Sequence, residues 1–308
     1  MNDHMLVMLV AERLSAEADR LLEELQRRGS KVVRFNFDEF PSRTRAALEI
    51  VDGASTAWFD TGRSRWRADE VAAAWLFIPP VIDPPAEIAH DARDLAVSES
   101  LAFLEGLWAT TDLHWLNHPR AISAASNRLV QMDVARAHGF RVPEALVTTS
   151  ATEIRAFARD HPMGVVLKDI DLPFVVHEDR PFSSYTQVLD DVLASLDAAR
   201  FAPVLVQERM AKKHEVRVFV IGDRVLAAGI DTAAHPEVDF RRHRFQVQLW
   251  EYDLSSALSR RCLEFARSFD LRYAAIDLAV DPAGEHHFFE VGPTSAWVWV
   301  ERGSGLPV

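Results

Sequence analysis

The sequence predicts a mixed α/β (α+β) protein. Apolar runs typical of strands alternate with helical spacings through the first two thirds of the chain, and strand signals dominate from Glu215 to the C-terminus. With 308 residues the chain is long enough for more than one domain. We see no internal repeat or flexible linker, so we expect the parts to pack together.

The N-terminal region opens with a strand, a helix and a second strand. Leu6–Ala11 is a short apolar run, apolar residues at helical spacing follow from Leu14 to Leu25, and residues 31–37 form the second strand. The connection between Val10 and Ser15 has no glycine fingerprint, so the dinucleotide-binding form of this unit is not supported. The expected elements after it are strands at 46–51, 57–60, 73–77 and 115–119 and a long helix at 87–110.

The alternation continues after residue 119 and then gives way to hairpins. Helices are expected at 123–139, 152–159 and 187–199, and strands at 145–149, 164–168 and 204–207. A tight turn at Gly222 and Asp223 joins strands at 216–221 and 224–229, and a turn at 281–284 joins strands at 275–280 and 287–291. Trp297 and Trp299 alternate, and we expect them on one face of a final strand.

Composition excludes several classes of function. The formal net charge of −12 argues against a general binder of nucleic acid or of anionic membranes. The single cysteine, Cys262, cannot form an internal disulfide or a Cys-rich zinc site, and a buried structural role is favoured over a nucleophile. The cluster from Arg241 to Arg244 is interpreted as a peptide-contact loop or a solvated strand edge. The sequence has no secretion signal and no apolar window of about 20 residues, so a cytoplasmic protein is expected.

Two acids stand on the facing strands of the last hairpin. Asp277 lies on the first strand and Glu290 on the second, in otherwise apolar surroundings. Paired strands can bring these carboxylates side by side, which is costly unless a cation lies between them. Oxygen ligands of this kind suit Mg²⁺ held against nucleotide phosphates. Two solvent-facing acids on a half-buried hairpin are the alternative at this point.

Two polar strand ends precede the hairpin. Lys168 ends an apolar strand, from which its ammonium can reach a phosphate, although an edge lysine extending into solvent fits the same pattern. The next strand ends in Gln207, Glu208, Arg209 and Met210. The free backbone groups and the apolar Met210 of this connection are suited to the edge and face of an adenine.

The order of these features resembles the ATP-grasp superfamily. A basic strand end, a Gln-Glu strand end, a strand with Glu215 and Arg217, and the Asp-Glu hairpin follow one another. The strings at 117–119, 142–148 and 297–301, together with Asp239-Phe240-Arg241, are similar to those of graspetide synthetases, the microviridin-type ATP-grasp peptide maturases. The resemblance implies an ATP-grasp fold with a pre-ATP-grasp α/β domain at 1–118, a central lid subdomain at 119–206 and a C-terminal subdomain at 207–308.

The resemblance also implies an activity and a site. The activity is an ATP-dependent carboxylate-amine/alcohol ligase that forms side-chain ester or amide macrocycles in a ribosomally made peptide through an acyl phosphate, with ADP and phosphate as products. The implied cofactors are ATP and Mg²⁺. Arg217 and Arg241, with Asp239, would act in catalysis, and Asp277 and Glu290 would bind the metal. The implied nucleotide contacts are Arg128, Lys168, Gln207, Glu208, Arg209, Met210 and Glu215.

The implied partner is a precursor peptide. It would carry a leader and a core in which Ser, Thr or Lys accompanies Asp or Glu; a homodimer is left open, and no nucleic-acid or membrane partner is expected. The chain departs from the family where Gly292 replaces an Asn that is usually a metal ligand, and where Arg128 replaces a Lys. Two alternatives therefore stay open: a RimK-like ligase that adds free amino acids to a protein, and a degenerate ATP-grasp protein that binds nucleotide or peptide without efficient turnover.

Overall fold

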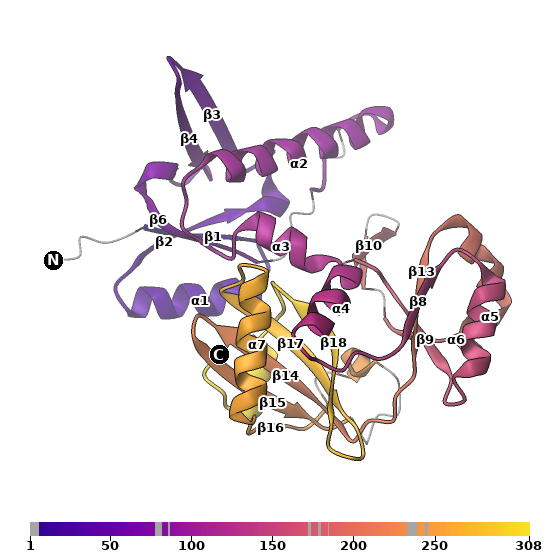
Figure 1. Ribbon diagram of the computed structural model, residues 1–308. Coiled ribbons are helices and arrows are strands. Elements are labelled where there is room, and N and C mark those ends of the chain that lie inside the picture. The colour runs from indigo at the N-terminus through magenta and orange to yellow at the C-terminus, as the bar shows by residue number, and fades with distance from the viewer. Residues whose placement is uncertain are drawn as a thin grey trace. The chain divides into compact units, whose positions relative to one another are not determined.

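The computed structural model describes residues 6–77, 82–85, 87–171, 174–177, 180–183, 185–232, 239–243 and 246–308 (Figure 1). The chain divides into two compact units: Met1–Ile122 with Thr294–Val298, called unit 1, and Ser123–Pro293 with Trp299–Val308, called unit 2. The mixed helix and sheet content confirms the predicted fold class. The division into three domains stays a prediction. None of the helices within the described ranges is long and apolar enough to cross a membrane.

Unit 1 is built on a four-stranded parallel sheet. Its order is β2-β1-β6-β7, with β1 at Leu6–Ala11, β2 at Lys31–Asn36, β6 at Val71–Leu76 and β7 at Trp115–Leu116. Helix α1 (Ala16–Arg27) begins where the Ser15 side chain accepts a hydrogen bond from the Ala18 amide. It ends before Gly29, whose φ of 83° favours a residue without Cβ. The predicted strand, helix and strand are confirmed.

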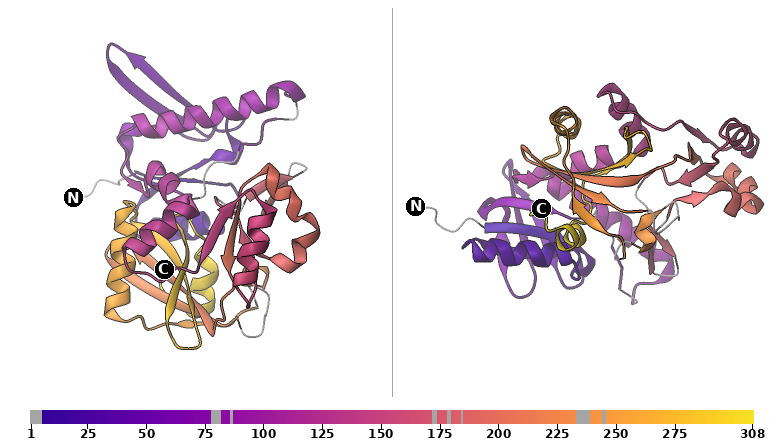
Figure 2. Two further views of the ribbon diagram at one scale, coloured as in Figure 1. Left: turned by 45° about the vertical axis from the view of Figure 1, so that its right-hand side comes forward. Right: turned by 90° about the horizontal axis from the view of Figure 1, so that it is seen from below.

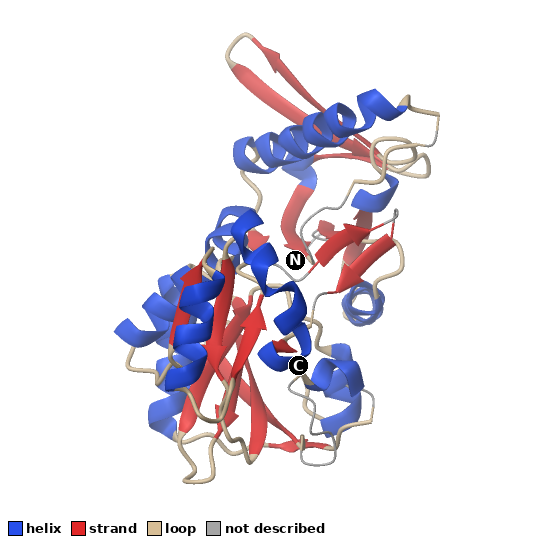
Figure 3. Cartoon of the chain, turned by 90° about the vertical axis from the view of Figure 1, so that its right-hand side faces the viewer, coloured by secondary structure: helices blue, strands red, loops and turns tan. Residues whose placement is uncertain are grey.

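A second sheet in unit 1 is antiparallel. It contains β3 (Arg45–Val51), β4 (Ala54–Asp60) and β5 (Arg65–Arg67). The β3–β4 hairpin stands out beyond the rest of the unit, near helix α2 (Arg93–Thr110) (Figure 3). Rings of Phe35, Phe59 and Trp108 pack together, with centroids 5.5–6.0 Å apart. The helix predicted at 87–110 is present as α2, but it begins at Arg93, after a short 3-10 turn at His90–Ala92.

Helices α3 (Pro119–Ser126) and α4 (Arg128–Ala137) replace the single helix predicted at 123–139. Asn127 separates them because its side-chain oxygen accepts hydrogen bonds from the amides of Leu129 and Val130, which makes it an N-cap. Helix α4 is tied to the end of the chain's last hairpin: Gln131 donates to the Val291 carbonyl and accepts from the Val291 amide, both at 3.0 Å. The break therefore fixes the start of α4 at Arg128.

The first large sheet of unit 2 has the order β12-β9-β13-β8 and is antiparallel. Its strands are β8 (Ala145–Thr148), β9 (Val165–Lys168), β12 (Gln187–Val188) and β13 (Val204–Glu208). Helix α5 (Ala151–Asp160) packs on β8 (Figure 2), and a small hairpin of β10 (Phe174–His177) and β11 (Arg180–Ser183) lies between β9 and β12 in the chain. The helix predicted at 187–199 is wrong in its first part, where β12 pairs with β9; α6 (Leu189–Val192) and a 3-10 helix (Leu193–Phe201) follow.

The second sheet of unit 2 has five antiparallel strands in the order β16-β15-β14-β17-β18. They are β14 (His214–Ile221), β15 (Arg224–Ile230), β16 (Leu249–Glu251), β17 (Tyr273–Val280) and β18 (His286–Gly292), and helix α7 (Ser256–Ser268) packs against β14, β15 and β17 (Figures 1 and 2). Both predicted hairpins are confirmed.

The strand expected at Trp297 and Trp299 is wrong, because α8 (Val298–Ser304) forms there. The alternation covers only three residues, too few to establish a period of two. The helix closes locally: the Gly305 amide donates to the Glu301 carbonyl, and the Ser304 hydroxyl donates to the Val300 carbonyl.

Candidate functional site

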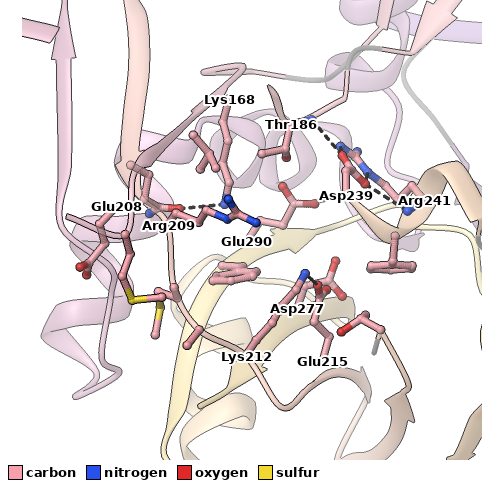
Figure 4. Close-up of a pocket in the computed structure, with 18 residues that line it drawn as sticks. Lys168, Thr186, Glu208, Arg209, Lys212, Glu215, Asp239, Arg241, Asp277 and Glu290 are labelled. Atoms are coloured by element: carbon pink, nitrogen blue, oxygen red, sulfur yellow. Dashed lines mark hydrogen bonds and ion pairs between the residues drawn. The ribbon is translucent and has the colours of Figure 1, made fainter. Parts of the chain in front are cut away.

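A cavity of about 430 Å³ lies within unit 2, between the ends of β9 and β13 and the surface of β14, β17 and β18 (Figure 4). Most of the predicted site residues line it, although they come from segments far apart in the sequence. The predicted residues along its wall are Lys168, Gln207, Glu208, Arg209, Met210, Glu215, Asp239, Arg241, Asp277 and Glu290. Arg128 and Arg217, the other two, touch the cavity's carboxylates from outside it.

The two acids of the last hairpin lie side by side. The register of β17 and β18 pairs Asp277 directly with Glu290, as the sequence predicts. The register shifts after Asp277, so that Leu278 pairs with Phe288 and Phe289 has no partner in the ladder. This bulge lets Phe289 and Glu290, although consecutive, both face the cavity.

Arg217 holds Asp277 from the neighbouring strand. The two residues are register partners in β14 and β17, and the guanidinium donates from Nε to Oδ1 at 2.8 Å and from Nη2 to Oδ2 at 2.7 Å. Burial opposes the charge on Arg217, but Asp277 outweighs it and raises the arginine pKa. The result is a buried, two-bonded ion pair in which both oxygens of Asp277 accept a hydrogen bond.

Arg128 holds Glu290 in a similar way. Its Nε and Nη2 donate to Glu290 Oε2 at 3.0 and 2.6 Å, and its Nη1 donates to the carbonyls of Asp169 and Asp171. Burial disfavours the charged form of Glu290, but Arg128, Arg241 and Lys168 together lower its pKa to about 2. Glu290 is therefore a carboxylate at any physiological pH.

Lys168 reaches into the cavity from the end of β9. Its ammonium donates to Gln207 Oε1 at 2.8 Å and lies 4.5 Å from the centre of the Phe289 ring (Figure 4). Burial lowers the pKa of Lys168 to about 8, against the attraction of Glu290. The ammonium is charged at neutral pH and its attraction for a phosphate would weaken in mildly alkaline solution.

The segment from Gln207 to Lys212 connects the two sheets of unit 2 and forms one wall of the cavity. Backbone hydrogen bonds hold it: the Glu208 amide donates to the Glu144 carbonyl at 2.9 Å, and the Arg209 amide donates to the Gly164 carbonyl at 3.0 Å. Met210 and Met163 add apolar sulfur-bearing side chains to this wall. The wall offers the mixed apolar and backbone surface that a flat purine ring needs.

Glu215 lies at the start of β14 and is paired with Lys212. Burial raises the pKa of Glu215, while Lys212 opposes this shift. Both residues line the cavity, Lys212 at the end of the connecting segment and Glu215 three residues after it (Figure 4). A polar pair in this place can exchange hydrogen bonds with the hydroxyls of a sugar.

The predicted Asp-x-Arg string forms a compact unit. Asp239 accepts hydrogen bonds from Nε and Nη2 of Arg241 and from the Thr186 amide. Although burial opposes ionisation, Arg241 lowers the pKa of Asp239. The backbone is a short 3-10 helix at Phe240–His243, not a strand edge, and Arg244 lies outside the described residues.

Trp299 links this string to Arg217. The Arg217 guanidinium carbon lies 5.3 Å from the centre of the Trp299 ring, and the Phe240 ring lies 6.0 Å away. Arg241 and Arg242 both lie over the Tyr185 ring, at 5.7 and 4.6 Å. Aromatic rings therefore pack near the guanidinium groups of these arginines.

Asp277 and Glu290 fit a magnesium ion only as part of its ligand set. Within the described residues no group of three or more Asp, Glu, His or Cys side chains could hold a metal. Mg²⁺ is commonly bound by one or two carboxylates together with substrate phosphates and waters, which matches a pair of acids in an open cavity.

Several wall residues were not predicted from the sequence. Lys212 stands three residues before Glu215, and outside a helix this spacing does not predict that the two side chains form a pair. Phe289 faces the cavity only because of the bulge in β18. The position of Met163, before β9, could have been found by asking which apolar residue flanks the strand that carries Lys168.

Comparison with known proteins agrees with this arrangement. The family model described as the MvdD pre-ATP grasp domain matches residues 8–123. No curated protein matches the chain in sequence. Among solved structures, the macrocyclase MdnC from Microcystis aeruginosa MRC, bound with the precursor peptide MdnA, is 22% identical with a TM-score of 0.84, over 97% of this chain and 94% of that one.

Two further solved structures are similar. A RiPP-associated ATP-grasp ligase from Chryseobacterium gregarium, in complex with ADP and a leader and core peptide, has a TM-score of 0.83 at 23% identity, over 97% of this chain and 92% of that one. Macrocyclase MdnB from Microcystis aeruginosa MRC has a TM-score of 0.81 at 22% identity, over 98% and 96%. The resemblance inferred from the sequence is therefore confirmed: residues 8–123 match a pre-ATP-grasp domain, and the chain has the ATP-grasp fold of microviridin-type macrocyclases.

Proposed function

We propose that this chain is an ATP-dependent ligase that closes side-chain ester or amide macrocycles in a ribosomally made peptide. The observation that supports the proposal most is the cavity of unit 2, which brings together Lys168, the paired carboxylates Asp277 and Glu290, and Arg241. Asp277 is held by Arg217 and Arg241 by Asp239. The similar structures are ligases and macrocyclases, two of them complexed with precursor or leader and core peptides.

In this proposal ATP lies along the cavity. Gln207 to Met210 hold the adenine, Glu215 binds the ribose and Lys168 meets the phosphates. Asp277 and Glu290 hold Mg²⁺, which supplies charge neutralisation for phosphoryl transfer when it is bound. Arg128 acts through Glu290, because its guanidinium is already bonded to that carboxylate.

The chemistry proposed for the site has two steps. An oxygen of a peptide Asp or Glu carboxylate attacks the γ-phosphorus of ATP, the bond to the β-phosphate oxygen breaks, and ADP leaves. A hydroxyl or amine of the same peptide then attacks the carbonyl carbon, loses its proton and expels phosphate. Arg241 stabilises the negative charge on the transferring phosphoryl group, and Asp239 orients Arg241. Arg217 acts through Asp277, because its guanidinium is bonded to both oxygens of that carboxylate. Each linkage removes one water from the peptide.

The test needs a precursor peptide, and we expect a short open reading frame beside the gene to encode one that is acidic and rich in Ser or Thr. Incubation with the protein, ATP and Mg²⁺ should give products that have lost whole multiples of one water by mass spectrometry, together with an equal amount of phosphate. Omission of ATP, and the Asp277→Ala protein, are the controls. Phosphate release without any change in peptide mass would contradict the proposal.

The second candidate is a degenerate ATP-grasp protein that binds nucleotide or peptide without efficient turnover. It is favoured because both carboxylates are bonded to guanidinium groups and Gly292 offers no side-chain ligand. Bound nucleotide with neither phosphate release nor water loss would favour it. Addition of free glutamate to a protein tail would favour the RimK-like alternative. The macrocyclase proposal also includes a leader in the precursor peptide and a core with Ser, Thr or Lys as partner residues. A homodimer and a cytoplasmic location are part of the same proposal.

A further inference from the structure

We propose that the site takes a single divalent cation with its nucleotide and that the Arg128 guanidinium stands where a second cation would bind beside Glu290. This inference rests on the proposed function, since it describes the nucleotide complex. It concerns the number of metal ions and the role of one arginine, and the residues around Glu290 support it.

Arg128 is fixed by bonds on every side of its guanidinium. Four of its five N–H groups are used, two toward Glu290 Oε2 and two toward the carbonyls of Asp169 and Asp171. Its backbone amide also donates to the Ile170 carbonyl at 2.8 Å. The side chain is 9% exposed and is not part of the cavity wall. Arg128 is therefore a positioning residue for Glu290 and not a ligand of the phosphates.

The bonds of Arg128 occupy one side of Glu290. Both of its donors reach the same oxygen, Oε2, and the carboxylate also lines the cavity. A metal ion that approaches from the cavity can bind Glu290, but a second ion on the Oε2 side would meet the guanidinium. A metal ion and a guanidinium bound to the same carboxylate oxygen would repel each other strongly in a partly buried site.

Asp277 limits the site in the same way. Each of its oxygens accepts one hydrogen bond from Arg217, so its charge is already balanced by a buried cation. Lys168 and Arg241 line the same cavity as Glu290 and add two further positive charges. One divalent ion and these side-chain cations can balance the negative charge of the nucleotide phosphates. A second divalent ion would add positive charge to a site that already contains several cations.

Beyond Glu290, strand β18 offers no further side-chain oxygen on the face that Glu290 shares. Residues two apart on a strand share a face, so position 292 lies on the same face of β18 as Glu290, and its register partner is Ala275. Gly292 has no side chain, and Ala275 has only a methyl group. A second ion would therefore lack the carboxylate or amide ligand that this face could have carried.

The experiment counts bound Mn²⁺. The protein is titrated with Mn²⁺ at saturating ADP, and free Mn²⁺ is measured by electron paramagnetic resonance, while calorimetry without metal confirms that ADP binds. The proposal predicts one Mn²⁺ per bound ADP for the unaltered protein. Two Mn²⁺ per bound ADP would overturn the proposal.

Variants separate the charge of Arg128 from its shape. The Arg128→Gln/Gly292→Asn double variant removes the cation and adds an amide ligand, so it should bind two Mn²⁺ per ADP. Arg128→Lys keeps the charge and should bind one. Arg136→Gln, the same change on the exposed end of α4, is the matched control and should also bind one. A double variant that melts like the unaltered protein yet binds one Mn²⁺ would overturn the role given to Arg128.

The outcomes also separate this inference from the proposed function. Failure to bind ADP, with or without metal, would overturn both. Peptide dehydration with two bound Mn²⁺ would overturn the single-ion inference and leave the proposed function standing. If the double variant does not fold, Gly292→Asn alone decides: Arg128 is still in place, so one Mn²⁺ is expected and two would contradict the proposal.

Discussion

The cavity of unit 2 is held differently at its two ends. At the carboxylate end, formed by Arg217, Asp277, Glu290 and Arg128, charged side chains are bonded to one another, and all of them are buried except Glu290, which is partly exposed. At the hinge end, formed by residues 207–212, the amides of Glu208 and Arg209 hold the chain by backbone hydrogen bonds, and Met210 adds an apolar side chain to the cavity wall. Substitutions at the carboxylate end should therefore affect folding and turnover together, whereas those at the hinge end should affect nucleotide affinity alone.

The difference follows from the cost of burying charge. A buried guanidinium that loses its carboxylate has no solvent to replace it, so its pair cannot be altered without a large penalty. The backbone of the hinge end keeps its hydrogen bonds whatever side chain stands at Met210. The following predictions test this contrast, and they begin with the largest effect.

Asp277→Asn should break the carboxylate end. The change leaves Arg217 buried without a counter-charge, so the free energy of unfolding should fall by about 3–5 kcal/mol, and kcat should fall at least about a hundredfold. Asp223→Asn is the matched control: Asp223 is 88% exposed and pairs with Arg267 at the surface, so its loss should cost less than about 1 kcal/mol. Urea denaturation measures the free energy of unfolding of both variants, and steady-state kinetics measures kcat. Equal losses for the two variants would remove the contrast between the pairs.

Lys168 should give the reaction an alkaline limit. Its ammonium is charged below a pKa of about 8, so attraction for the phosphates is present at pH 7 and is lost as the pH rises through about 8. Above that pH, kcat/KM for ATP should fall by about tenfold per pH unit. Lys168→Arg should shift this limit out of the measured range, because guanidinium stays protonated. A limit near pH 8 that persists in the variant would assign it to another group.

Trp299 should have a smaller effect at the carboxylate end. Replacement by Ala removes the ring that packs on Arg217 and Phe240, which should lower kcat/KM by about fivefold, the equivalent of about 1 kcal/mol. Trp299→Phe keeps a ring and should restore most of the rate. Steady-state kinetics with ATP and the peptide measures both variants. Equal rates for the Ala and Phe variants would exclude a role for the ring.

Met210 should give the smallest change. Met210→Ala shortens an apolar wall of the hinge end, so KM for ATP should rise about threefold at unchanged kcat. Phe201→Ala, on an exposed side chain outside the cavity wall, should leave both constants unchanged. A loss of kcat in Met210→Ala would show that the hinge end also takes part in the chemistry.

Elements with a strong local pattern could be predicted from the sequence. The alternation around the 281–284 turn predicted the hairpin, and the bulge after Asp277 brings Asp277 opposite Glu290. Asn127 could have been recognised as a cap, but its position within a continuous helical pattern hid the break that starts α4 at Arg128. At 187–188 the sequence pattern was too short, and pairing with β9 determined the structure. At Trp299 the pattern was also too short, and the hydrogen bonds of a short helix determined it.

The ion pairs of the site could not be predicted in the same way. Arg128 and Glu290 are far apart in the sequence, and nothing in either string says that one binds the other. Arg217 was predicted to contact phosphate, yet its hydrogen-bond partner is Asp277, its register partner on the adjacent strand. Such partners follow from the register of the sheets and from the break before α4, which only the folded chain provides.

The most direct test of the account follows an oxygen atom from peptide to phosphate. If a peptide carboxylate is activated as an acyl phosphate, a peptide labelled with ¹⁸O in its Asp and Glu carboxyls should transfer one ¹⁸O to the released phosphate for every linkage formed. Mass spectrometry of the phosphate measures this transfer. Water loss from the peptide with unlabelled phosphate would contradict ATP-driven carboxylate activation in this site.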